Sequence, residues 1–523
     1  MEHQFSHNKW IFLLHTFIGF IIWFLSIPGI LFVIFPAYLL RRAHSIFAPS
    51  HLEFLGPEDA ILSLAETSAH LNSNTAQIWR LSPGILNVSE FRALFYQCFL
   101  STPEKRRKYR NFGARIVSWG CYTWKEVRSR IDLEKQIKLG PTDLNLVEDE
   151  DKFEEWIARW MATNDYAPEM AAWEGIILHG REKNESILLL KMDHALTDGY
   201  TWGHLASMLA GMGDKMPYLV RDHDKEISWL RKSQIFLAFP SVSTKDVFSW
   251  LRGKSVPYHC YSTPGTEKNS EWMMSLTRLD LGMVKRIKRH VGGSGVHFNT
   301  VLGSVVAGAL KRWCLEEGGV TIDKLPEKVW LPNPVGWPGH PIMEKETLNG
   351  KGMGNHMSTR NQSFPFAIED DPLHRLLDGE KSVQYAESVG QAIGFRWIVG
   401  SVGWLTPTTI LRQTLAKSSP SIRSGLEQVL TPLLLSPEPH KLLGMDVIGL
   451  HLPVHVPHLL VATKLYVVPV SVGGHLEVSV SATKDAFRDQ KSLNRFTKVM
   501  LSEELAKLWA KCEQDLPEKL IIH

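Results

Sequence analysis

A histidine with the spacing of a general base lies in the stretch KMDHALTDGY, residues 191–200. Asp198 follows His194 at the fourth position, and Gly199 comes next. An imidazole titrates near neutral pH, so a histidine in such a motif could accept the proton of a hydroxyl group. The alternative is a partly buried histidine at a strand end, with Thr197 or Asp198 as the N-cap of the next helix. The elements around the motif must decide between these interpretations.

The motif is predicted to lie between a strand and a helix. Two apolar runs, 174–178 and 186–192, flank a polar turn and predict a hairpin. The second run predicts a buried central strand that ends at His194. Apolar residues then recur at helical spacing from Trp202 to Leu209. A strand–turn–helix junction on a rigid scaffold is a common place for catalytic side chains.

The pattern H-x-x-x-D-G occurs a second time, in HRLLDG at residues 374–379. Asp371 and Pro372 stand where an N-cap and a first helical residue would stand, and leucines follow at helical spacing. His374 and Asp378 would then form an i,i+4 pair on an ordinary helix. We therefore predict a structural role for the second copy.

Composition limits the function classes. The chain has 523 residues, 44% of them hydrophobic, which allows a large core and more than one domain. The formal net charge of +3 gives no basic excess for nucleic acid. The five cysteines are dispersed without a C-x-x-C, which argues against a disulfide framework and a zinc site. The histidines of HLPVHVPH, residues 451–458, have no carboxylate or cysteine close in sequence, so we predict no metal site.

The N-terminus carries a long uncharged segment. No Lys, Arg, Asp or Glu occurs from Trp10 to Leu40, which is longer than the roughly 20 residues of one membrane span. A Pro-Gly pair at 28–29 allows either a tilted, kinked anchor helix or a re-entrant hairpin. A buried helix of a soluble protein is the third interpretation. Arg41 and Arg42 outweigh Lys9, so the positive-inside rule favours a cytoplasmic main domain.

Patterns elsewhere predict an α/β protein. Strands are predicted at 75–81, 273–279 and 328–332, and a hairpin is predicted to turn at Gly473 and Gly474. Helices are predicted at 58–70, 89–99 (with Ser89 as N-cap), 150–163, 281–290, 300–314 and 490–512.

Three further segments complete the predicted organisation. The basic segment 101–111 is either a solvated loop or a contact for a phosphate-bearing cofactor or the membrane surface. The stretch 397–410 is too short for a span and is either core or an interfacial helix. Residues 221–270 show little periodicity and are interpreted as a linker. The predicted parts are a membrane anchor (1–45), a first half (46–220), this linker and a second half (271–523).

Several loose motifs occur in one order along residues 52–510. They are GPEDA at 56–60, AWE at 172–174, DHALTDG at 193–199, VHFNTVLGSVVAGALKRW at 296–313, GKGMGNHMS at 350–358 and DDPLHRL at 370–376. In this order they resemble the motifs of the wax ester synthase/diacylglycerol acyltransferase family, within the CoA-dependent acyltransferases. Two positions depart from that family. Its first motif histidine is Asp193 here, and its Asn-Asp pair is Asn299-Thr300.

The resemblance implies an α/β fold of two halves, each a mixed sheet with flanking helices. It implies transfer of a long-chain acyl group from acyl-CoA, a co-substrate rather than a permanent cofactor, to a fatty alcohol or diacylglycerol. The expected location is the endoplasmic reticulum membrane, with the catalytic domain facing the cytoplasm. Two alternatives stay open. One is a transferase for a short acyl donor or a small alcohol, and the other is a non-catalytic lipid-binding membrane protein.

The resemblance also implies roles for individual residues. His194 would be the general base, and Asp198 would be structural and paired with an arginine. Gly199 would leave space beside the base, and Gly354 and Asn355 would line the site from the second half. The Asn299 amide is our candidate for an oxyanion donor, and its alternative role is N-cap of a helix that begins at Thr300.

Overall fold

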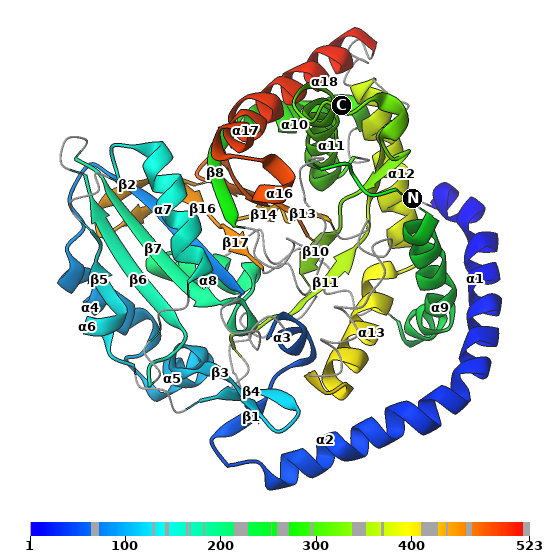
Figure 1. The fold of residues 1–523 in the computed structure, drawn as a ribbon, viewed down its shortest axis with the longest axis horizontal. Coiled ribbons are helices and arrows are strands. Elements are labelled where there is room, and N and C mark those ends of the chain that lie inside the picture. Colours follow the sequence, from blue (N-terminus) through cyan, green and yellow to red (C-terminus); the bar gives the residue numbers. More distant parts are fainter. Residues whose placement is uncertain are drawn as a thin grey trace.

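A computed structural model gives the fold of the chain (Figure 1). It describes residues 2–63, 73–127, 131–141, 146–163, 166, 169–180, 184–213, 228–252, 254–258, 271–292, 296–336, 352–367, 371–408, 427–435, 438–456 and 463–515.

A seven-stranded mixed sheet is the scaffold of the first half. Its spatial order is β15 (Lys441–Leu442), β16 (Met445–His451), β2 (Asn74–Ser82), β7 (Ser186–Asp193), β6 (Trp173–His179) and β5 (Ile137–Leu139), and β17 (Val454–His455) also pairs with β2. β6 and β7 are antiparallel neighbours, as the hairpin pattern predicted. Every residue of β7 is buried, which confirms the predicted central strand.

The first sheet is completed by the far end of the chain. β15, β16 and β17 lie between residues 441 and 455, and β16 runs antiparallel to β2. Residues 271–523, predicted as the second half, therefore also supply strands to the sheet of the first. Local periodicity does not reveal such an exchange, because a strand pattern does not name its pairing partner.

A five-stranded sheet forms the centre of the second half. Its order is β13 (Gln428–Leu430), β18 (Leu465–Val472), β19 (His475–Thr483) and β8 (Trp272–Leu279), with β14 (Leu433–Leu434) parallel to β18. β18 and β19 form the predicted hairpin. The turn residues Gly473 and Gly474 have φ of 57° and 83°, a conformation that favours glycine. Two short pairs and a three-stranded sheet add β9 (Lys328–Trp330) with β12 (Ser363–Pro365), β10 (Asn333–Gly336) with β11 (Met357–Arg360), and β1 (Leu52–Phe54), β4 (Tyr122–Glu126) and β3 (Arg115–Trp119).

Helices flank both sheets (Figure 1). Those of the first half are α3 (Pro57–Leu62), α4 (Val88–Phe99), α5 (Pro103–Lys108), α6 (Leu133–Gln136), α7 (Glu150–Ala162) and α8 (Gly199–Leu209). Those of the second half are α10 (Leu281–Gly292), α11 (Phe298–Glu316), α12 (Pro372–Ser388), α13 (Gln391–Leu405), α16 (Lys484–Phe487), α17 (Gln490–Asn494) and α18 (Leu501–Asp515).

The structure corrects three local predictions. Asn87, not Ser89, is the N-cap of α4, because its side chain accepts hydrogen bonds from the next backbone N–H groups. The basic segment 101–111 contains α5 rather than only a loop, with Thr102 as N-cap. The segment 221–270 contains a long helix, α9 (Trp229–Arg252). Only the first part of the predicted helix 58–70 is seen, as α3, since residues 64–72 lie outside the described part of the chain.

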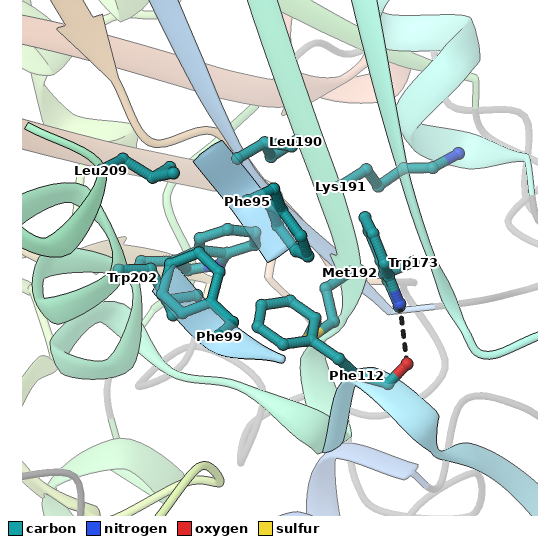
Figure 2. A pocket seen from close by; sticks show the side chains of 10 residues that line it. Phe95, Phe99, Phe112, Trp173, Leu190, Lys191, Met192, Trp202 and Leu209 are labelled. Atoms are coloured by element: carbon teal, nitrogen blue, oxygen red, sulfur yellow. Dashed lines mark hydrogen bonds between the residues drawn. The ribbon is translucent and has the colours of Figure 1, made fainter. Parts of the chain in front are cut away.

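Aromatic side chains close the core beside β7 (Figure 2). Phe95 stacks on Trp173 with 4.8 Å between ring centroids, and Trp173 Nε1 donates to the Phe112 carbonyl at 2.8 Å. These rings, with Leu190 and Met192 of β7, leave a void of about 10 Å³, enough for one water molecule. This cavity has no room for an acyl chain.

The N-terminal arm, residues 2–47, is one long helical segment. It consists of α1 (Glu2–Gly29), a π-helical turn (Ile30–Ile34) and α2 (Phe35–Phe47). The π-helical turn follows Pro28, where proline disturbs the regular hydrogen bonding. Within the described chain, Leu13–Phe47 is the helical stretch that is long and apolar enough to cross a membrane, and only 6% of its most apolar window is buried. The interpretation as a buried soluble helix is therefore wrong.

Candidate active site

His194 begins a short turn at the end of β7. Asp193 is the last residue of the strand, and His194–Leu196 form a 3₁₀ turn. The Asp193 carboxylate accepts a hydrogen bond from the Ala195 backbone N–H at 2.8 Å, and His194 N–H donates to the Ser73 carbonyl at 2.8 Å. Asp193 thus caps the turn that carries His194.

The His194 ring has the tautomer that a base needs. Its Nδ1 lies 3.0 Å from the Thr197 carbonyl oxygen. A carbonyl only accepts hydrogen bonds, so Nδ1 carries the proton and Nε2 keeps its lone pair. Burial lowers the pKa of His194, and its side chain is nearly inaccessible, with 8% of the residue exposed. The imidazole is therefore neutral at pH 7.

Asp198 joins the motif to two other segments. Its Oδ1 accepts the Thr201 N–H at 2.8 Å, which makes Asp198 the N-cap of α8. Its Oδ2 accepts the His356 N–H at 2.9 Å. The space next to Gly199 is filled by Leu433 of β14, since a Cβ at position 199 would lie 2.9 Å from Leu433 Cδ1. The close packing of α8 on β14 thus accounts for this glycine.

Residues 354–356, here called the strap, hold the motif from the second half. Asn355 Nδ2 donates to the His194 carbonyl oxygen at 2.7 Å, and Thr201 Oγ1 donates to the Gly354 carbonyl at 3.3 Å. Gly354 has φ of 144°, a conformation that side chains of L-residues rarely adopt. With the His356 N–H on Asp198, the strap contacts the motif at two points and α8 at a third. The structure brings Gly354, Asn355, Asp198 and His194 together, while a role of the first two in substrate binding stays a prediction.

Asp59 also lies at the candidate site, although it was not among the residues predicted for that site. Its Oδ1 accepts the Asn355 backbone N–H at 2.8 Å and the Asn355 Nδ2 at 2.9 Å. The two hydrogens of that amide are therefore shared between Asp59 and the His194 carbonyl. Burial raises the pKa of Asp59, and hydrogen bonds from Asn355 oppose this shift. The sequence feature that could have pointed to Asp59 is its position in GPEDA, one of the motifs that carry the resemblance.

Arg396 of α13 lies close to the motif and contacts Glu58 and His356, while an arginine paired with Asp198 stays a prediction. Arg396 Nε lies 3.4 Å from Glu58 Oε1, and its Nη2 lies 3.0 Å from His356 Nδ1. Burial lowers the pKa of Arg396, and the charges of Glu58 and Asp198 oppose this shift. Arg396 thus places a positive charge beside the acidic residue of the motif. Its sequence neighbourhood, an apolar helix, offered no signal for this role.

Asn299 lies in the first turn of α11, and His297 is the N-cap residue. The interpretation of Asn299 as the N-cap is therefore wrong. With the Asn333 amide in the orientation that satisfies its own hydrogen bonds, Asn299 Nδ2 donates to Asn333 Oδ1 at 2.6 Å. Asn333 begins β10, which pairs with β11 directly after the strap. In the described part of the chain, Asn299 is linked to His194 through these strands and not by a direct hydrogen bond.

An ion cluster holds this end of α11. His297 Nδ1 lies 2.7 Å from Glu380 Oε1, and its Nε2 lies 3.2 Å from Glu387 Oε1. These two carboxylates raise the pKa of His297 to about 9, so the ring is charged at neutral pH. Both glutamates belong to α12, which also pairs with Arg360 of β11 through Glu387. The turn that carries Asn299 is thereby tied to the strand that follows the strap.

The second copy of the motif has the structural role predicted for it. Asp371 caps α12 by accepting the N–H groups of Leu373 and His374. The His374 side chain is 53% exposed, and its Nε2 lies 3.9 Å from Asp378 Oδ2. His374 is therefore one member of a surface i,i+4 pair.

His451 and His455 of the 451–458 segment have ordinary packing partners, and His458 lies outside the described residues. His451 Nε2 lies 3.5 Å from Glu477 Oε2, and burial lowers the pKa of His451 to about 3. The His455 ring packs against Trp272 with 5.0 Å between centroids. In the described ranges of the chain, no three His, Cys, Asp or Glu side chains are grouped to hold a metal ion.

Two mixed sheets with flanking helices give the chain the condensation/CoA-dependent acyltransferase fold. Its solved members include the wax ester synthase/diacylglycerol acyltransferase from Marinobacter aquaeolei VT8, at 14% identity over 88% of this chain and 100% of that chain, with a TM-score of 0.50. The trichothecene 15-O-acetyltransferase TRI3 from Fusarium sporotrichioides matches with a TM-score of 0.58, at 12% identity over 88% of this chain and 94% of its own.

A third similar structure is the starter condensation domain of rhizomide synthetase RzmA, a mutant in complex with C8-CoA and Leu-SNAC. It matches at 12% identity with a TM-score of 0.54, over 88% of this chain and 95% of its own. No family model matches the chain. At these identities the likeness concerns the fold, and it confirms the predicted fold class.

Proposed function

We propose that the chain is an acyl-CoA-dependent O-acyltransferase of the wax ester synthase/diacylglycerol acyltransferase kind. Its substrates would be a long-chain acyl-CoA and a fatty alcohol or diacylglycerol. The observation that carries the proposal is His194, a neutral imidazole with its Nδ1 proton held by a backbone carbonyl, at the meeting point of the two halves. The names of two similar structures, a wax ester synthase/diacylglycerol acyltransferase and an O-acetyltransferase, support the reaction class. The C8-CoA bound to a third supports the donor.

The proposed reaction is a direct transfer. His194 Nε2 accepts the hydroxyl proton of the alcohol while its oxygen attacks the thioester carbonyl. The tetrahedral intermediate collapses with cleavage of the carbon–sulfur bond. The proton on His194 then passes to the departing thiolate, so the products are the ester and free CoA. A lowered pKa favours this role, because a protonated imidazole at working pH could not accept the proton.

Asn299 is the proposed donor to the oxyanion. Its Nδ2 carries two hydrogens, and the contact with Asn333 uses one of them. The second is left to stabilise charge on the thioester oxygen. In this scheme Asp198, the strap and Arg396 position His194 without reacting.

The experiment compares two histidines with the same sequence pattern. Microsomes from cells that express the chain receive labelled palmitoyl-CoA with hexadecanol or with diacylglycerol. We expect His194→Ala to lower ester formation by about 10²–10⁴-fold, the usual worth of a general base. His374→Ala, in the exposed copy, should leave it unchanged. Wild-type product from the His194→Ala chain would refute the mechanism.

Two alternatives are tested with the same membranes. Acetyl-CoA and a short alcohol cover the small-substrate transferase, which the likeness to an O-acetyltransferase favours. A non-catalytic lipid-binding protein is favoured by Asp193, because the family's first histidine is replaced by a residue that caps the turn. No product with any donor and acceptor, together with binding of labelled lipid, would support that alternative.

We also propose that the chain resides in the endoplasmic reticulum membrane with both halves facing the cytoplasm. The sequons at Asn87, Asn184 and Asn361 give the test. In this orientation the chain carries no sugar, so its gel mobility should not change on treatment with an N-glycosidase. A shift would place the halves in the lumen.

A further inference from the structure

The N-terminal arm exposes apolar side chains along its length. Seven apolar residues spread from α1 to the end of α2 are each at least 65% exposed: Phe17, Phe24, Leu25, Phe32, Val33, Ile46 and Phe47. Scattered single apolar residues are normal on a protein surface, but a continuous apolar surface marks an interaction site. Charge is missing as well, since no Lys, Arg, Asp or Glu occurs from Trp10 to Leu40. The chemistry of this surface fits hydrocarbon.

One end of the arm is docked on α9 and on α12 of the second half. Trp23 stacks on Phe236 of α9 with 4.6 Å between centroids and donates its Nε1–H to the Phe236 carbonyl at 2.9 Å. His15 lies 2.8 Å from Ser241 Oγ and 2.9 Å from the Tyr385 hydroxyl of α12. At Gly19 the two helices are so close that a Cβ would lie 1.8 Å from the Leu237 carbonyl oxygen.

The other end of the arm is docked on the first half. Arg41 is only 4% exposed, its guanidinium lies 3.7 Å from the Phe54 ring, and Nη2 donates to the Leu55 carbonyl at 3.4 Å. The His44 ring packs edge-on against Tyr122 with 5.1 Å between centroids. Arg41 is thus engaged with the protein. Figure 1 shows the arm passing along α9 and then curving to β1 and β4.

These two attachments decide between the possible membrane arrangements. A spanning helix needs its two ends on opposite sides of the bilayer, but both ends of this arm are held by one folded body. The body cannot follow α1 into the membrane, because α9 carries Arg231, Lys232 and Lys245, and each charge at the bilayer centre costs about 2.5–3.5 kcal/mol. Both the single span and the deep re-entrant hairpin would break the contacts of His15, Trp23 or Arg41.

We propose that the arm lies in the plane of the membrane and binds one leaflet of a phospholipid bilayer. The docked face stays on the protein, and the exposed face enters the boundary between head groups and acyl chains, about 5–10 Å deep. The start of α9 extends the same surface. α9 runs antiparallel to α1, as the pairs His15–Ser241 and Trp23–Phe236 show, and its first residues Trp229 and Leu230 are 79% and 60% exposed.

Cross-linking of the membrane-bound chain tests the docked face. The double variant His15→Cys/Ser241→Cys, treated in intact microsomes with a short bifunctional thiol reagent, should give an internally linked species on a non-reducing gel. Each single variant controls for native cysteines. Leu25→Cys/Ser241→Cys is the matched control, because Leu25 is 71% exposed, and it should give no link. Absence of the His15–Ser241 link in membranes, with its presence in detergent, would overturn the proposal.

Depth measurements separate the in-plane arrangement from a hairpin or a span. A fluorophore is placed on Leu14→Cys, Leu25→Cys or Phe32→Cys, with the accessible native cysteines replaced by serine. The full chain is reconstituted in phosphatidylcholine vesicles with a spin label near the head group or near the chain end. All three positions should be quenched most by the shallow label. Strongest quenching of Phe32→Cys by the deep label would indicate a hairpin or a span, and would overturn the proposal.

Substitution of the exposed face measures the binding itself. Leu25→Asp/Phe32→Asp should reduce the share of the chain that sediments with phosphatidylcholine vesicles by about tenfold or more. Ile85→Asp is the control, since Ile85 is 53% exposed but lies outside the arm, and it should bind as wild type does. Equal loss for both variants would refute the arm as the lipid-binding surface. None of these readouts depends on acyl transfer. The inference is therefore tested independently of the proposed function.

Discussion

His194 and Asp198 belong to one sequence motif but contact different partners. The ring of His194 is oriented by the Thr197 carbonyl, whereas Asp198 caps α8 and accepts the His356 N–H. Asp193, adjacent to His194 in the chain, holds the turn through Ala195. Each acidic residue near the histidine thus has a backbone N–H as partner. At the residue scale, His194, the proposed base, is held in place by several positioning groups.

Asn355 is the positioning residue with the clearest test. Asn355→Ala removes the donor to the His194 carbonyl and leaves Asp59 with one hydrogen bond fewer. We expect a loss of about 1–3 kcal/mol in the free energy of unfolding. Because the turn that carries the base loosens, kcat per folded molecule should fall by about tenfold or more.

The control for this prediction is an exposed asparagine with a purely local role. Asn87→Ala removes the N-cap of α4 and should cost about 1 kcal/mol of stability. Urea unfolding and acyl transfer are measured on both chains. If the two variants lose stability without any difference in kcat, Asn355 is only structural.

The packing of α8 against β14 fixes the position of the helix that follows the motif. α8 begins at Gly199, and Leu433 of β14 fills the space beside it. β14 belongs to the sheet of the second half, so the first residue of a first-half helix packs on a second-half strand. At the scale of elements, the motif is therefore built where α8, β7 and β14 meet.

The packing at this junction predicts that a second substitution can restore a variant of Gly199. Gly199→Ala should destabilise the protein by about 1–3 kcal/mol and lower acyl transfer, because the new Cβ would overlap Leu433. The double variant Gly199→Ala/Leu433→Ala should recover part of both losses, since the smaller side chain makes room. Leu433→Ala alone measures the cost of the cavity. Simple additivity of the two substitutions, seen in thermal unfolding, would show that the two side chains do not clash.

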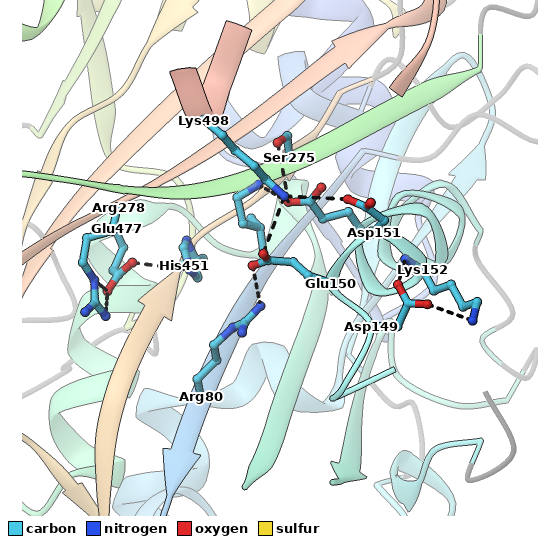
Figure 3. Close-up of polar contacts among 12 residues, drawn as sticks. Arg80, Asp149, Glu150, Asp151, Lys152, Ser275, Arg278, His451, Glu477 and Lys498 are labelled. Carbon is cyan, nitrogen blue, oxygen red and sulfur yellow. Dashed lines mark hydrogen bonds and ion pairs between the residues drawn. The ribbon is translucent and has the colours of Figure 1, made fainter. Parts of the chain in front are cut away.

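The two halves are joined by a charged interface as well as by exchanged strands (Figure 3). Lys498 lies 3.1 Å from Glu154 and 3.6 Å from Glu150 of α7. Glu154 also accepts the Leu276 N–H of β8 at 2.8 Å. Burial raises the pKa of Glu154 to about 6, and Lys498 is among the groups that oppose this shift. At the scale of the whole molecule, a cation of the second half neutralises a buried carboxylate of the first.

At this scale we predict that the stability of the protein depends on pH. The folded-state pKa of Glu154 is raised above its unfolded value, so folding disfavours its charged form and stability falls as pH rises through about 6. Lys498→Met removes the compensating charge and should cost about 1–3 kcal/mol at pH 8 and less at pH 5, where Glu154 is protonated. Urea unfolding at both values measures this. Lys491→Met, on the exposed surface of α17, is the control, and an equal deficit at both values would contradict the role of Glu154.

Local patterns in the sequence determined the elements that carry the site. The continuous apolar run of β7, the Gly-Gly turn of the last hairpin and the cap of α12 were all predicted correctly, because each depends on neighbours a few residues away. The same locality identified the second copy of the motif as an ordinary helix. The uncharged run of the arm was also evident, since it needs only composition.

Tertiary structure alone decided what meets His194. Asn355 is 161 residues from His194 and 296 residues from Asp59, and β16 lies more than 300 residues beyond β2. A hydrogen-bond donor at one position does not specify an acceptor hundreds of residues away, because that choice depends on how whole elements pack. The docking of the arm has the same origin. Its apolar run is compatible with a span, and the contacts of His15, Trp23 and Arg41 with the folded halves are what favour an arrangement in the membrane plane.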